Sequence, residues 1–435
     1  MEIRDPIHGS LPLEDGEVAV LDSAAYQRLR AIKQLGFMEF SFPGATHSRY
    51  LHSLGVCHLA GRAFDIIFAN YPFRSKQTCR RLRQALRLAA LLHDIGHGPL
   101  SHTTEEVMPP LKDLDIQVYA NRKPEWVRPE DSSRQANHED YTIKFLTASS
   151  LTPTLKNNFS DIDPIHVACL IDRSLICPDD FFREGDQDFR PILSQIISSE
   201  MDVDRMDYLE RDAYFCGTNY GRVELNWLLA NMTYLEVEGE LHLALNRRAL
   251  YTFDDLLLAR HHMHLMIYFH HKSIIYEEML MRYLASDDCE FFLPSSIEDY
   301  IGYTDYALYQ HIAGVENSWA RRVAEQRPFR MLFELHSSEE SPRTENMEKV
   351  LNEQGIKTIL ASTSARLSKY HSSSAKEHSV QIYVVDQYDP QSKPYPIEKS
   401  TEIFQKYEET RRIERVYVAP EEFGWAKQIL LENRL

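Results

Sequence analysis

Apolar and polar positions alternate with helical periodicity over most of the chain, and this pattern predicts a mainly α fold. The spacing predicts helices over residues 21–35, from Arg49 to about Asn70, through the apolar run 85–92, and from about Thr252 onward. The first of these ends at Gly36, and its polar residues predict a solvated, basic helix face: Gln27, Arg28, Arg30, Lys33 and Gln34.

Short alternating segments predict strands in two other places. Residues 230–250 have the pattern of a hairpin with a turn at Glu238 and Gly239. Beyond residue 328, four short strands are expected among helical segments, at 329–335, 357–361, 380–385 and 415–418. We therefore expect a helical domain over 1–328, interrupted by a proline-rich loop at about 109–136, and a small α+β appendage over 329–435.

Composition narrows the class of protein. The 435 residues carry a formal net charge of −17, which disfavours binding to nucleic acid because such binding relies on broad basic surfaces. No apolar run has the length of a membrane helix, and the first residues lack the layout of a signal peptide. The six cysteines form no CxxC pair, which favours reduced thiols. These features predict a cytoplasmic protein with no membrane partner.

Histidine and aspartate are concentrated directly after the apolar helix. His93 and Asp94 are adjacent, and His97 and His102 follow them among glycines and a proline. Gly96 should end the helix there, so that neighbouring side chains converge on one point. Imidazole and carboxylate groups bind first-row divalent metals such as Mn, Fe, Ni or Zn. We predict a metal site here, with simple helix capping by the His-Asp pair as the alternative.

Two further residues are candidates for completing this site. His52 lies three positions after Arg49, so one helix face carries both, as a ligand with a nearby phosphate contact or as a plain surface pair. The segment 198–212 is highly charged, but its apolar positions leave Asp204 near the buried edge of a helix. We expect Asp204 to be the fourth ligand, with a fully solvated helix as the alternative.

The helix predicted from Thr252 carries a second group of basic and aromatic residues. Arg260, His264, Tyr268 and His271 recur at spacings of four, four and three, which places them on one helical stripe. No carboxylate stands among these positions. The stripe therefore favours contacts with phosphate and sugar rather than a metal cage.

The set His52, His93-Asp94 and Asp204 has the H…HD…D pattern of the HD phosphohydrolase superfamily, which this chain resembles. Further motifs bring it closer to the deoxynucleoside triphosphate triphosphohydrolases, above all those like the human sterile-alpha-motif/HD-domain enzyme: 5–9, 27–36, 47–55, 93–102 and 202–208. The similarity covers roughly residues 1–290. It implies an HD-domain helical core and metal-dependent hydrolysis of dNTPs to deoxynucleoside and inorganic triphosphate.

The resemblance assigns roles to individual residues. It implies four metal ligands, namely His52, His93, Asp94 and Asp204. It implies that His102, with Glu105 and His138, hands a proton to the leaving oxygen, although the family usually carries Asp at the position of Glu105. The residues expected to contact the substrate are Gln34, Leu35, Arg49, His97, Arg205, Tyr208, Asp212, Arg260, His264 and Tyr268.

The same resemblance implies cofactors and partners. Asp22, Gln27 and Arg30 match positions that recognise an activating guanine, so GTP or a dNTP is the expected activator. The cofactor would be a divalent transition metal, Mn, Fe, Ni or Zn, with Mg accompanying the triphosphate. Proteins of this kind form dimers or tetramers, and residues 329–435 are expected to serve oligomerisation.

Two other functions stay open at this point. One is an HD phosphodiesterase or phosphohydrolase that acts on another nucleotide, although the signatures of alarmone hydrolases and of cyclic-dinucleotide enzymes are absent from the chain. The other is a nucleotide-sensing protein with an inactive site, against which the intact set of ligands argues.

Overall fold

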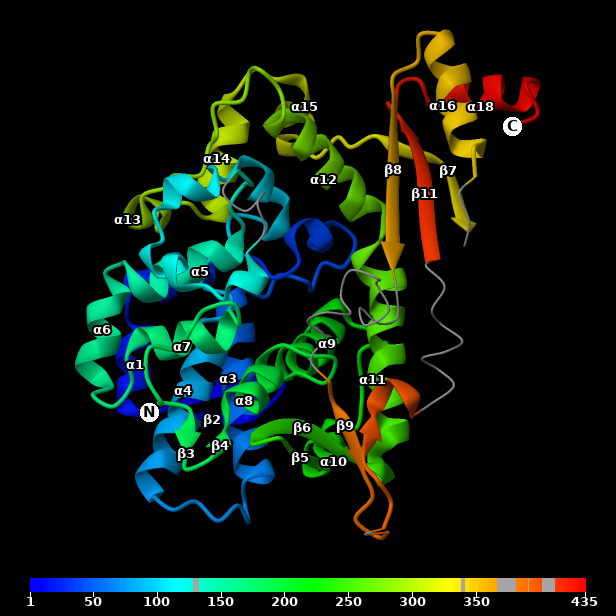
Figure 1. The fold of residues 1–435 in the computed structure, drawn as a ribbon. Helices are drawn as coiled ribbons and strands as arrows, with labels where there is room; N and C mark the ends of the chain where they lie inside the picture. The colour runs from blue at the N-terminus through cyan, green and yellow to red at the C-terminus, as the bar shows by residue number, and fades with distance from the viewer. Residues whose placement is uncertain (128–132, 338–340, 366–380, 390, 401–410) are drawn as a thin grey trace.

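The computed structural model describes residues 1–127, 133–337, 341–365, 381–389, 391–400 and 411–435. The fold is mainly α, as the sequence predicts, with the C-terminal strands beside the helical body (Figure 1). The α-helices are α1 (Asp15–Leu21), α2 (Ala24–Gln27), α3 (Arg49–Ile67), α4 (Lys76–Leu92), α5 (His138–Thr147), α6 (Leu151–Asn158), α7 (Pro164–Ile171), α8 (Arg190–Ile197), α9 (Val203–Cys216), α10 (Leu225–Ala230), α11 (Leu250–Met263), α12 (His271–Leu284), α13 (Ile297–Tyr300), α14 (Asp305–Gly314), α15 (Ser318–Ala324), α16 (Arg343–Glu353) and α18 (Phe423–Glu432).

Shorter helical turns join several of these elements. The 3-10 turns are η1 (Arg28–Ala31), η2 (Gly36–Phe40), η3 (His102–Val107), η4 (Leu111–Leu114), η5 (Gln117–Asn121), η6 (Pro124–Trp126), η8 (Arg247–Ala249) and η10 (Ile397–Lys399), and η9 (His264–Tyr268) is a π turn. The region 109–136 therefore consists of short turns in its described part, in keeping with the loop that its prolines predict.

The centre of the body is formed by α3 and α4, which pack against each other, while α9 packs on α3. Ser75 caps the start of α4 by accepting a hydrogen bond from the Gln77 amide at 3.1 Å. All residues from Ala85 to Leu92 are buried, and burial of each leucine in this run contributes about 1.5–3 kcal/mol. The C-terminal end of α4 is thus held firmly in the core, where the His93-Asp94 pair follows.

The predicted helix over 21–35 is shorter in the structure. It consists of α2 and the 3-10 turn η1, after which Ile32 is extended. Arg28 is the reason that its basic face is not continuous, because this side chain is only 5% exposed and turns into the core. The solvated face that the sequence predicts is therefore limited to neighbouring positions such as Arg30.

The long helix predicted from Thr252 is also interrupted. α11 ends at Met263, and the π turn η9 separates it from α12. A π turn has i→i+5 hydrogen bonds and so contains more residues than an α-helical turn. Residues before and after it therefore no longer share the helix face that α-helical spacing predicts. The backbone carbonyl of His271 accepts a hydrogen bond from the Tyr417 hydroxyl at 3.0 Å, so this end of the predicted stripe belongs to the contact with the C-terminal strands.

The strands form three sheets in the described part of the chain. They are β1 (Glu2–Asp5), β2 (Gly9–Pro12), β3 (Arg183–Glu184), β4 (Gln187–Asp188), β5 (Met232–Val237), β6 (Glu240–Asn246), β7 (Arg330–Ser337), β8 (Thr358–Ala365), β9 (Tyr383–Val385), β10 (Tyr395–Pro396) and β11 (Arg411–Val418). The hairpin expected over 230–250 is present as β5 and β6, with Val237 paired to Glu240.

The C-terminal strands are divided between two sheets. β11 lies between β7 and β8 in an antiparallel sheet, which α16 and α18 cover with a small core of their own (Figure 1). β9, the strand expected at 380–385, instead pairs in parallel with β6 of the helical body, and Val380 lies outside the described residues. The last quarter of the chain therefore pairs with the helical body through β9 and is not a detached unit.

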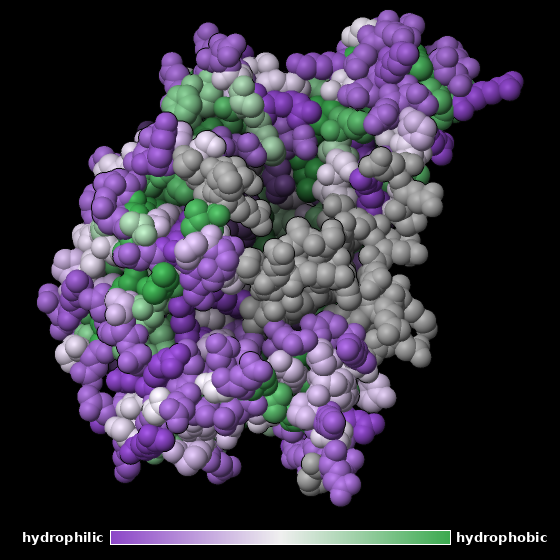
Figure 2. Space-filling view, viewed as in Figure 1, coloured by the Kyte–Doolittle hydropathy of each residue, from purple (hydrophilic) through white to green (hydrophobic). Residues whose placement is uncertain are grey.

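On the face shown in Figure 2, hydrophilic residues predominate and hydrophobic residues form separate patches. Within the described ranges, no helix combines the length and the apolar character needed to cross a membrane.

Candidate metal centre and active site

The four predicted ligands converge at the meeting point of three helices. His52 lies in the first turns of α3, His93 is the residue that ends α4, and Asp94 follows it. Asp204 lies in the first turn of α9. Because α4 ends at His93, the side chains of His93 and Asp94 both reach the same point.

The ligand atoms of His52, His93 and Asp94 lie within 4.8 Å of one another, and Asp204 adds an oxygen close to both histidines. His52 Nε2 lies 2.9 Å from Asp204 Oδ1 and 3.6 Å from Asp94 Oδ2. His93 Nε2 lies 3.4 Å from both Asp94 Oδ1 and Asp204 Oδ1. With metal–ligand distances of about 2.0–2.2 Å, ligand atoms around one ion lie about 3–3.6 Å apart. The geometry therefore fits a divalent metal.

His93 provides a more specific test of that fit. Its Nδ1 lies 2.8 Å from the Ala90 carbonyl oxygen, so this nitrogen carries the proton and donates it. Its Nε2 is buried and makes no regular hydrogen bond to any residue in the described part of the chain. A buried nitrogen with a free lone pair, facing two carboxylates, is the arrangement expected of a metal-binding imidazole.

His52 is oriented from behind by Asp207. Its Nδ1 donates to Asp207 Oδ2 at 2.8 Å, which directs Nε2 toward Asp94 and Asp204. Asp207 is fully buried and also accepts hydrogen bonds from Arg211, at 2.8 and 2.9 Å, and lies 2.7 Å from His8 Nε2. Carboxylates of this kind fix the ring and tautomer of a ligand histidine. The four-residue spacing of Asp207 and Arg211 predicts an ion pair on one helix face, but the sequence does not show that Asp207 also orients His52.

The electrostatics of the centre are those of a cation site. Burial alone would lower the pKa of His52, but hydrogen bonds to Asp204 and Asp207 raise it to about 10. Burial alone would raise the pKa of Asp94, yet Arg49, His93 and His97 together hold it well below its usual value. Asp94 and Asp204 therefore stay ionised, and the field at this point favours positive charge.

A second group of side chains lies against this centre. His97, His102, Glu105 and His138 bring their ligand atoms within 4.8 Å of one another, and His97 Nε2 lies 3.4 Å from Asp94 Oδ1. The His97 ring stacks on the His138 ring with centroids 3.8 Å apart. The structure thus brings together all three residues predicted to supply the proton to the leaving group.

Glu105 links the two outer histidines of this group. Its Oε1 lies 3.1 Å from His102 Nδ1 and 2.5 Å from His138 Nδ1. Burial raises the pKa of Glu105, but these two hydrogen bonds outweigh it and lower the pKa to about 2. The ionised carboxylate accepts hydrogen bonds from both Nδ1–H groups, which leaves Nε2 of His102 free to exchange a proton with a ligand. The His102 side chain is 69% exposed and is therefore accessible.

Arg49 lies beside the centre as predicted, but it is occupied by protein groups. Its guanidinium pairs with Asp94, and Nε donates to Ser101 Oγ at 2.9 Å. Arg205 pairs with Glu200, and Arg260 Nη1 lies 3.7 Å from the same carboxylate. Glu200, which the sequence does not mark as a site residue, therefore lies close to two of the predicted phosphate contacts, Arg205 and Arg260.

The residues predicted on the sugar side form a second network. Asp212 accepts a hydrogen bond from the Tyr268 hydroxyl at 2.8 Å and lies 2.7 Å from His47 Nε2. The Tyr268 ring is 6.4 Å from that of Tyr208 and 4.9 Å from that of His264. Gln34, followed by the half-buried Leu35, keeps a buried Oε1 that has no hydrogen-bond partner in the described ranges. This oxygen is available to a ligand.

Of the residues predicted to bind an activator, Arg30 lies against Tyr50 at the start of α3. Arg30 Nε donates to Gln27 Oε1 at 2.8 Å, and the Arg30 guanidinium lies 3.6 Å from the centre of the Tyr50 ring. Asp22 is exposed where α1 ends. Tyr50 directly follows Arg49, so this cluster is covalently adjacent to the candidate site.

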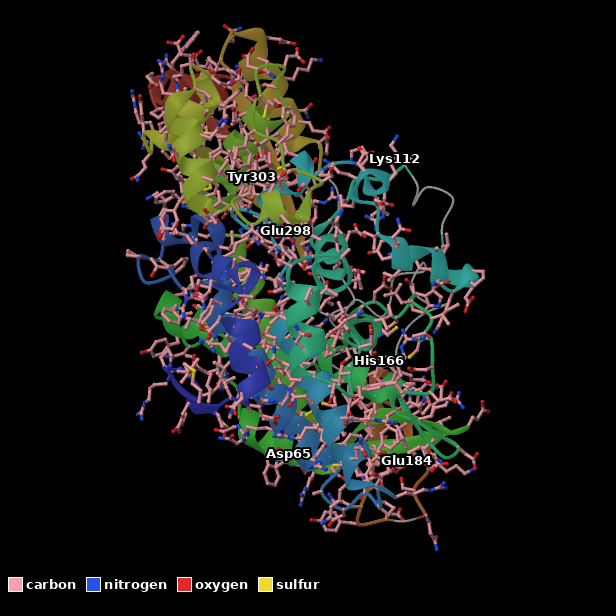
Figure 3. The ribbon with its side chains drawn as sticks, turned by 90° about the vertical axis from the view of Figure 1, so that its left-hand side faces the viewer. Asp65, Lys112, His166, Glu184, Glu298 and Tyr303 are labelled. Atoms are coloured by element: carbon pink, nitrogen blue, oxygen red, sulfur yellow. The ribbon has the colours of Figure 1, made fainter. Side chains whose placement is uncertain are left out.

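Another group with metal-binding side chains is explained by ordinary hydrogen bonds. His166, labelled in Figure 3, lies with Cys177 and Asp179 at the start of α7. Its Nδ1 accepts from the Asp163 amide at 3.1 Å, so Nε2 must carry the proton that it donates to Asp179 at 3.1 Å. A protonated Nε2 has no lone pair for a metal, and we assign this group a structural role.

Comparison with known proteins agrees with this geometry. Residues 49–212 match the family model described as the HD domain. The chain is 32% identical over 281 residues to an uncharacterized protein of Mycoplasma genitalium, a match that covers 63% of this chain and 57% of that protein. It is 28% identical over 297 residues to the human deoxynucleoside triphosphate triphosphohydrolase SAMHD1, covering 66% of this chain and 44% of that protein.

The fold is shared with a solved structure over its full length. A hypothetical protein from Aquifex aeolicus superposes with a TM-score of 0.74 at 23% identity, covering 99% of both chains. The chain spans about half the length of the curated relatives that it matches. The matched model and the His-Asp centre at the meeting point of α3, α4 and α9 agree with each other, so residues 49–212 of this chain form an HD domain.

Proposed function

We propose that this protein hydrolyses deoxynucleoside triphosphates to the deoxynucleoside and inorganic triphosphate. The observation that carries the proposal is the contact between the metal-ligand set and the histidine group, made by His97 and Asp94 at 3.4 Å. This contact supports the proposal, because cleavage of a phosphate ester needs a proton donor near the cation, and His97 belongs to the same cluster as His102. The human relative named as a deoxynucleoside triphosphate triphosphohydrolase supports the choice of substrate.

The metal would be held by His52, His93, Asp94 and Asp204. The chemistry supplied by a divalent cation in such a site is polarisation of a phosphoryl oxygen and a lower pKa for a water molecule. The donor set of imidazole and carboxylate suits Mn, Fe, Ni or Zn, and Mg is expected to accompany the triphosphate. Asp207 orients His52, and the negative charges of Asp94 and Asp204 would help to hold the cation.

His102 is the proposed acid. A water oxygen forms a bond to the α-phosphorus while the bond between that phosphorus and the 5′ oxygen breaks. Nε2–H of the His102 imidazolium gives its proton to the departing 5′ oxygen, and a proton released by the attacking water restores the imidazolium. Glu105 and His138 hold the ring, and an acid of this kind contributes about 10²–10⁴ in rate.

The remaining predicted residues would bind the substrate. Arg49, Arg205 and Tyr208 would offset the triphosphate charge, which requires their present carboxylate partners to share them with the ligand. Gln34 and Asp212 would contact the sugar edge. Asp22, Gln27 and Arg30 remain the proposed site for an activating GTP or dNTP, and assembly into dimers or tetramers remains a proposal for residues 329–435.

Product analysis tests the proposal. The purified protein is incubated with each dNTP and rNTP in Mn²⁺ or Mg²⁺, with and without GTP, and the products are separated by chromatography. Deoxynucleoside and intact triphosphate are expected. Monophosphate and pyrophosphate would contradict the role of His102, and a product only from another nucleotide would favour a different HD phosphohydrolase. Absence of any product would favour a nucleotide-sensing role.

A further inference from the structure

The backbone immediately before His102 is strained. Leu100 has φ of 52° and Ser101 has φ of 60° with ψ of −116°. Non-glycine residues avoid this region of backbone conformation, and each costs about 1–3 kcal/mol unless its surroundings hold it in place. The conformation of these two residues sets the direction in which the His102 side chain leaves the loop. Something in the structure must therefore hold this turn.

Asp305 provides that hold from a distant part of the chain. Its side chain is 3% exposed, and Oδ1 accepts a hydrogen bond from the Leu100 amide at 2.7 Å. Oδ2 accepts from the Lys33 amide at 2.9 Å. One carboxylate thus joins the turn before His102 to the segment that continues into Gln34 and Leu35. The Ser101 hydroxyl reinforces the link by donating to the Lys33 carbonyl at 3.0 Å.

The residues just before Asp305 hold the other half of the same loop. The Tyr300 hydroxyl donates to the Gly96 carbonyl at 2.8 Å. Arg28 donates to the His97 carbonyl at 2.6 Å and to the Tyr303 carbonyl at 3.2 Å, and its guanidinium lies 4.4 Å from the centre of the Tyr300 ring. Tyr303 is labelled in Figure 3, on the turn between α13 and α14. Residues 300–305 thus form a brace against the loop 95–101.

We propose that Asp305 is a positioning residue of the active site, whose buried carboxylate fixes the strained turn Leu100–Ser101 and thereby the direction of His102. The inference rests on the proposed function, since it concerns the acid of that reaction. Asp305 does not contact the reacting atoms. It acts through two backbone amides, and its loss should reduce proton delivery to the leaving group more than it reduces binding of metal or substrate.

Asp305→Asn is the sharpest substitution, because the amide keeps the size of the side chain but offers only one oxygen to the two N–H donors. Two substrates are compared: a dNTP, whose 5′ alkoxide needs a proton, and bis(p-nitrophenyl) phosphate, whose nitrophenolate leaves without one. We expect kcat on the dNTP to fall by about 10–100-fold, with KM and metal content unchanged. On the nitrophenyl ester, kcat should fall less than about threefold, because general acid catalysis contributes little there.

A double-mutant cycle gives a second readout. If Asp305 acts through His102, the double variant D305N/H102A should be no slower than H102A alone. Glu414→Gln is the matched control, since it removes a buried carboxylate in the C-terminal sheet that binds Thr344. If D305N does not fold, Tyr300→Phe is used in its place, because it removes only the hydroxyl that binds the Gly96 carbonyl. We expect Y300F to lower kcat on the dNTP more than on the nitrophenyl ester, with a smaller difference than D305N.

The outcomes are distinct. A wild-type protein that cleaves neither ester overturns the proposed function itself. An active wild type with an equal loss on both substrates in D305N, or with additive effects in the cycle, overturns the positioning role. A folded D305N with unchanged kcat on the dNTP also overturns it.

Discussion

Nδ1 of His52 lies 2.8 Å from Asp207 Oδ2, while Nε2 of the same ring lies 2.9 Å from Asp204 Oδ1. One imidazole is therefore held between a carboxylate that orients it and a carboxylate proposed to share its metal. Asp207 is in turn fixed by Arg211, which also pairs with Asp5 at 2.8 Å. The orientation of a metal ligand thus depends on a buried network that reaches the first strand of the chain.

Asp207→Asn should weaken metal binding. The amide cannot accept the His52 proton and those of Arg211 as a carboxylate does, so the imidazole loses its fixed tautomer. Loss of such a partner lowers metal affinity by about 10–100-fold. Competition with a chromogenic chelator, using Mn²⁺ or Zn²⁺ and the metal-stripped protein, measures this affinity directly.

Asp5→Asn is the matched control for that variant. It disturbs the same Arg211 guanidinium but leaves the His52–Asp207 contact in place. We expect D5N to lose stability while its metal affinity changes less than about threefold. Equal losses of affinity in the two variants would show that Asp207 acts through general stability and not through His52.

Gly55→Ala should disrupt the same network from α3. A Cβ added at Gly55 would overlap the Asp207 carboxylate and the Arg211 guanidinium, and both groups are buried. Displacing either partner of a buried ion pair costs about 3–5 kcal/mol. Urea denaturation followed by circular dichroism should show a loss of this order, together with lower metal retention.

Gly314→Ala controls for the effect of alanine itself. Gly314 ends α14, and a Cβ there meets no atom within 4 Å in the described structure. Alanine is the better helix former, so G314A should have stability equal to the wild type or higher by up to about 1 kcal/mol. A G55A protein as stable as G314A would contradict the close packing of α3 on the Asp207–Arg211 pair.

Local patterns in the sequence predicted the helical fold and the hairpin β5–β6. The end of α4 follows from Gly96 and the apolar run before it, and the convergence of His93 and Asp94 follows from that end. The helix over 21–35 was wrong in length because Arg28 is bound by the carbonyls of Ile95, His97 and Tyr303. Those partners lie 67 or more positions away, and helical spacing contains no information on them.

The supporting residues of the site were missed for a similar reason. Asp305 and Leu100 are separated by 205 positions, and no motif around Asp305 marks it as part of an active site. Glu200 carried a signal, since it stands near Arg205 in a charged segment, but only the fold brings Arg260 to it. Asp207 stands in the same charged segment as Asp204, but nothing in the sequence shows that its carboxylate contacts His52 on another helix.

His102→Ala should separate chemistry from metal binding. The side chain is largely exposed, so its removal costs little stability, and the four ligands remain in place. Loss of a general acid lowers the rate by about 10²–10⁴. We expect H102A to retain the metal content of the wild type, measured by elemental analysis, and to lose most of its dNTP hydrolysis.

Glu106→Gln is the control for H102A on the same 3-10 turn. Glu106 is exposed, whereas its neighbour Glu105 accepts hydrogen bonds from His102 and His138. E106Q should keep the activity of the wild type within about twofold. An H102A protein as active as E106Q would exclude His102 as the acid.

Glu277 on α12 makes stability depend on pH. Burial raises the pKa of this carboxyl to about 7, with Glu278 adding to the effect and the Ser273 hydroxyl opposing it. A raised pKa means that the folded chain binds this proton more tightly than the unfolded chain. The unfolded carboxyl titrates near 4.5, so between pH 4.5 and about 7 the folded state holds more protons, and stability falls as the pH rises.

Glu277→Gln should remove this fall. The neutral amide has no charge to bury, so the variant should exceed the wild type in free energy of unfolding by about 2–3 kcal/mol at pH 8 and match it near pH 4.5. Urea denaturation at both pH values measures the difference. Glu278→Gln is the matched control on the next residue, where the carboxylate pairs with Arg282 at 2.5 Å, and there we expect a change of less than about 1 kcal/mol. Equal stability of E277Q and the wild type at pH 8 would mean that Glu277 is solvated and that another group governs the pH dependence.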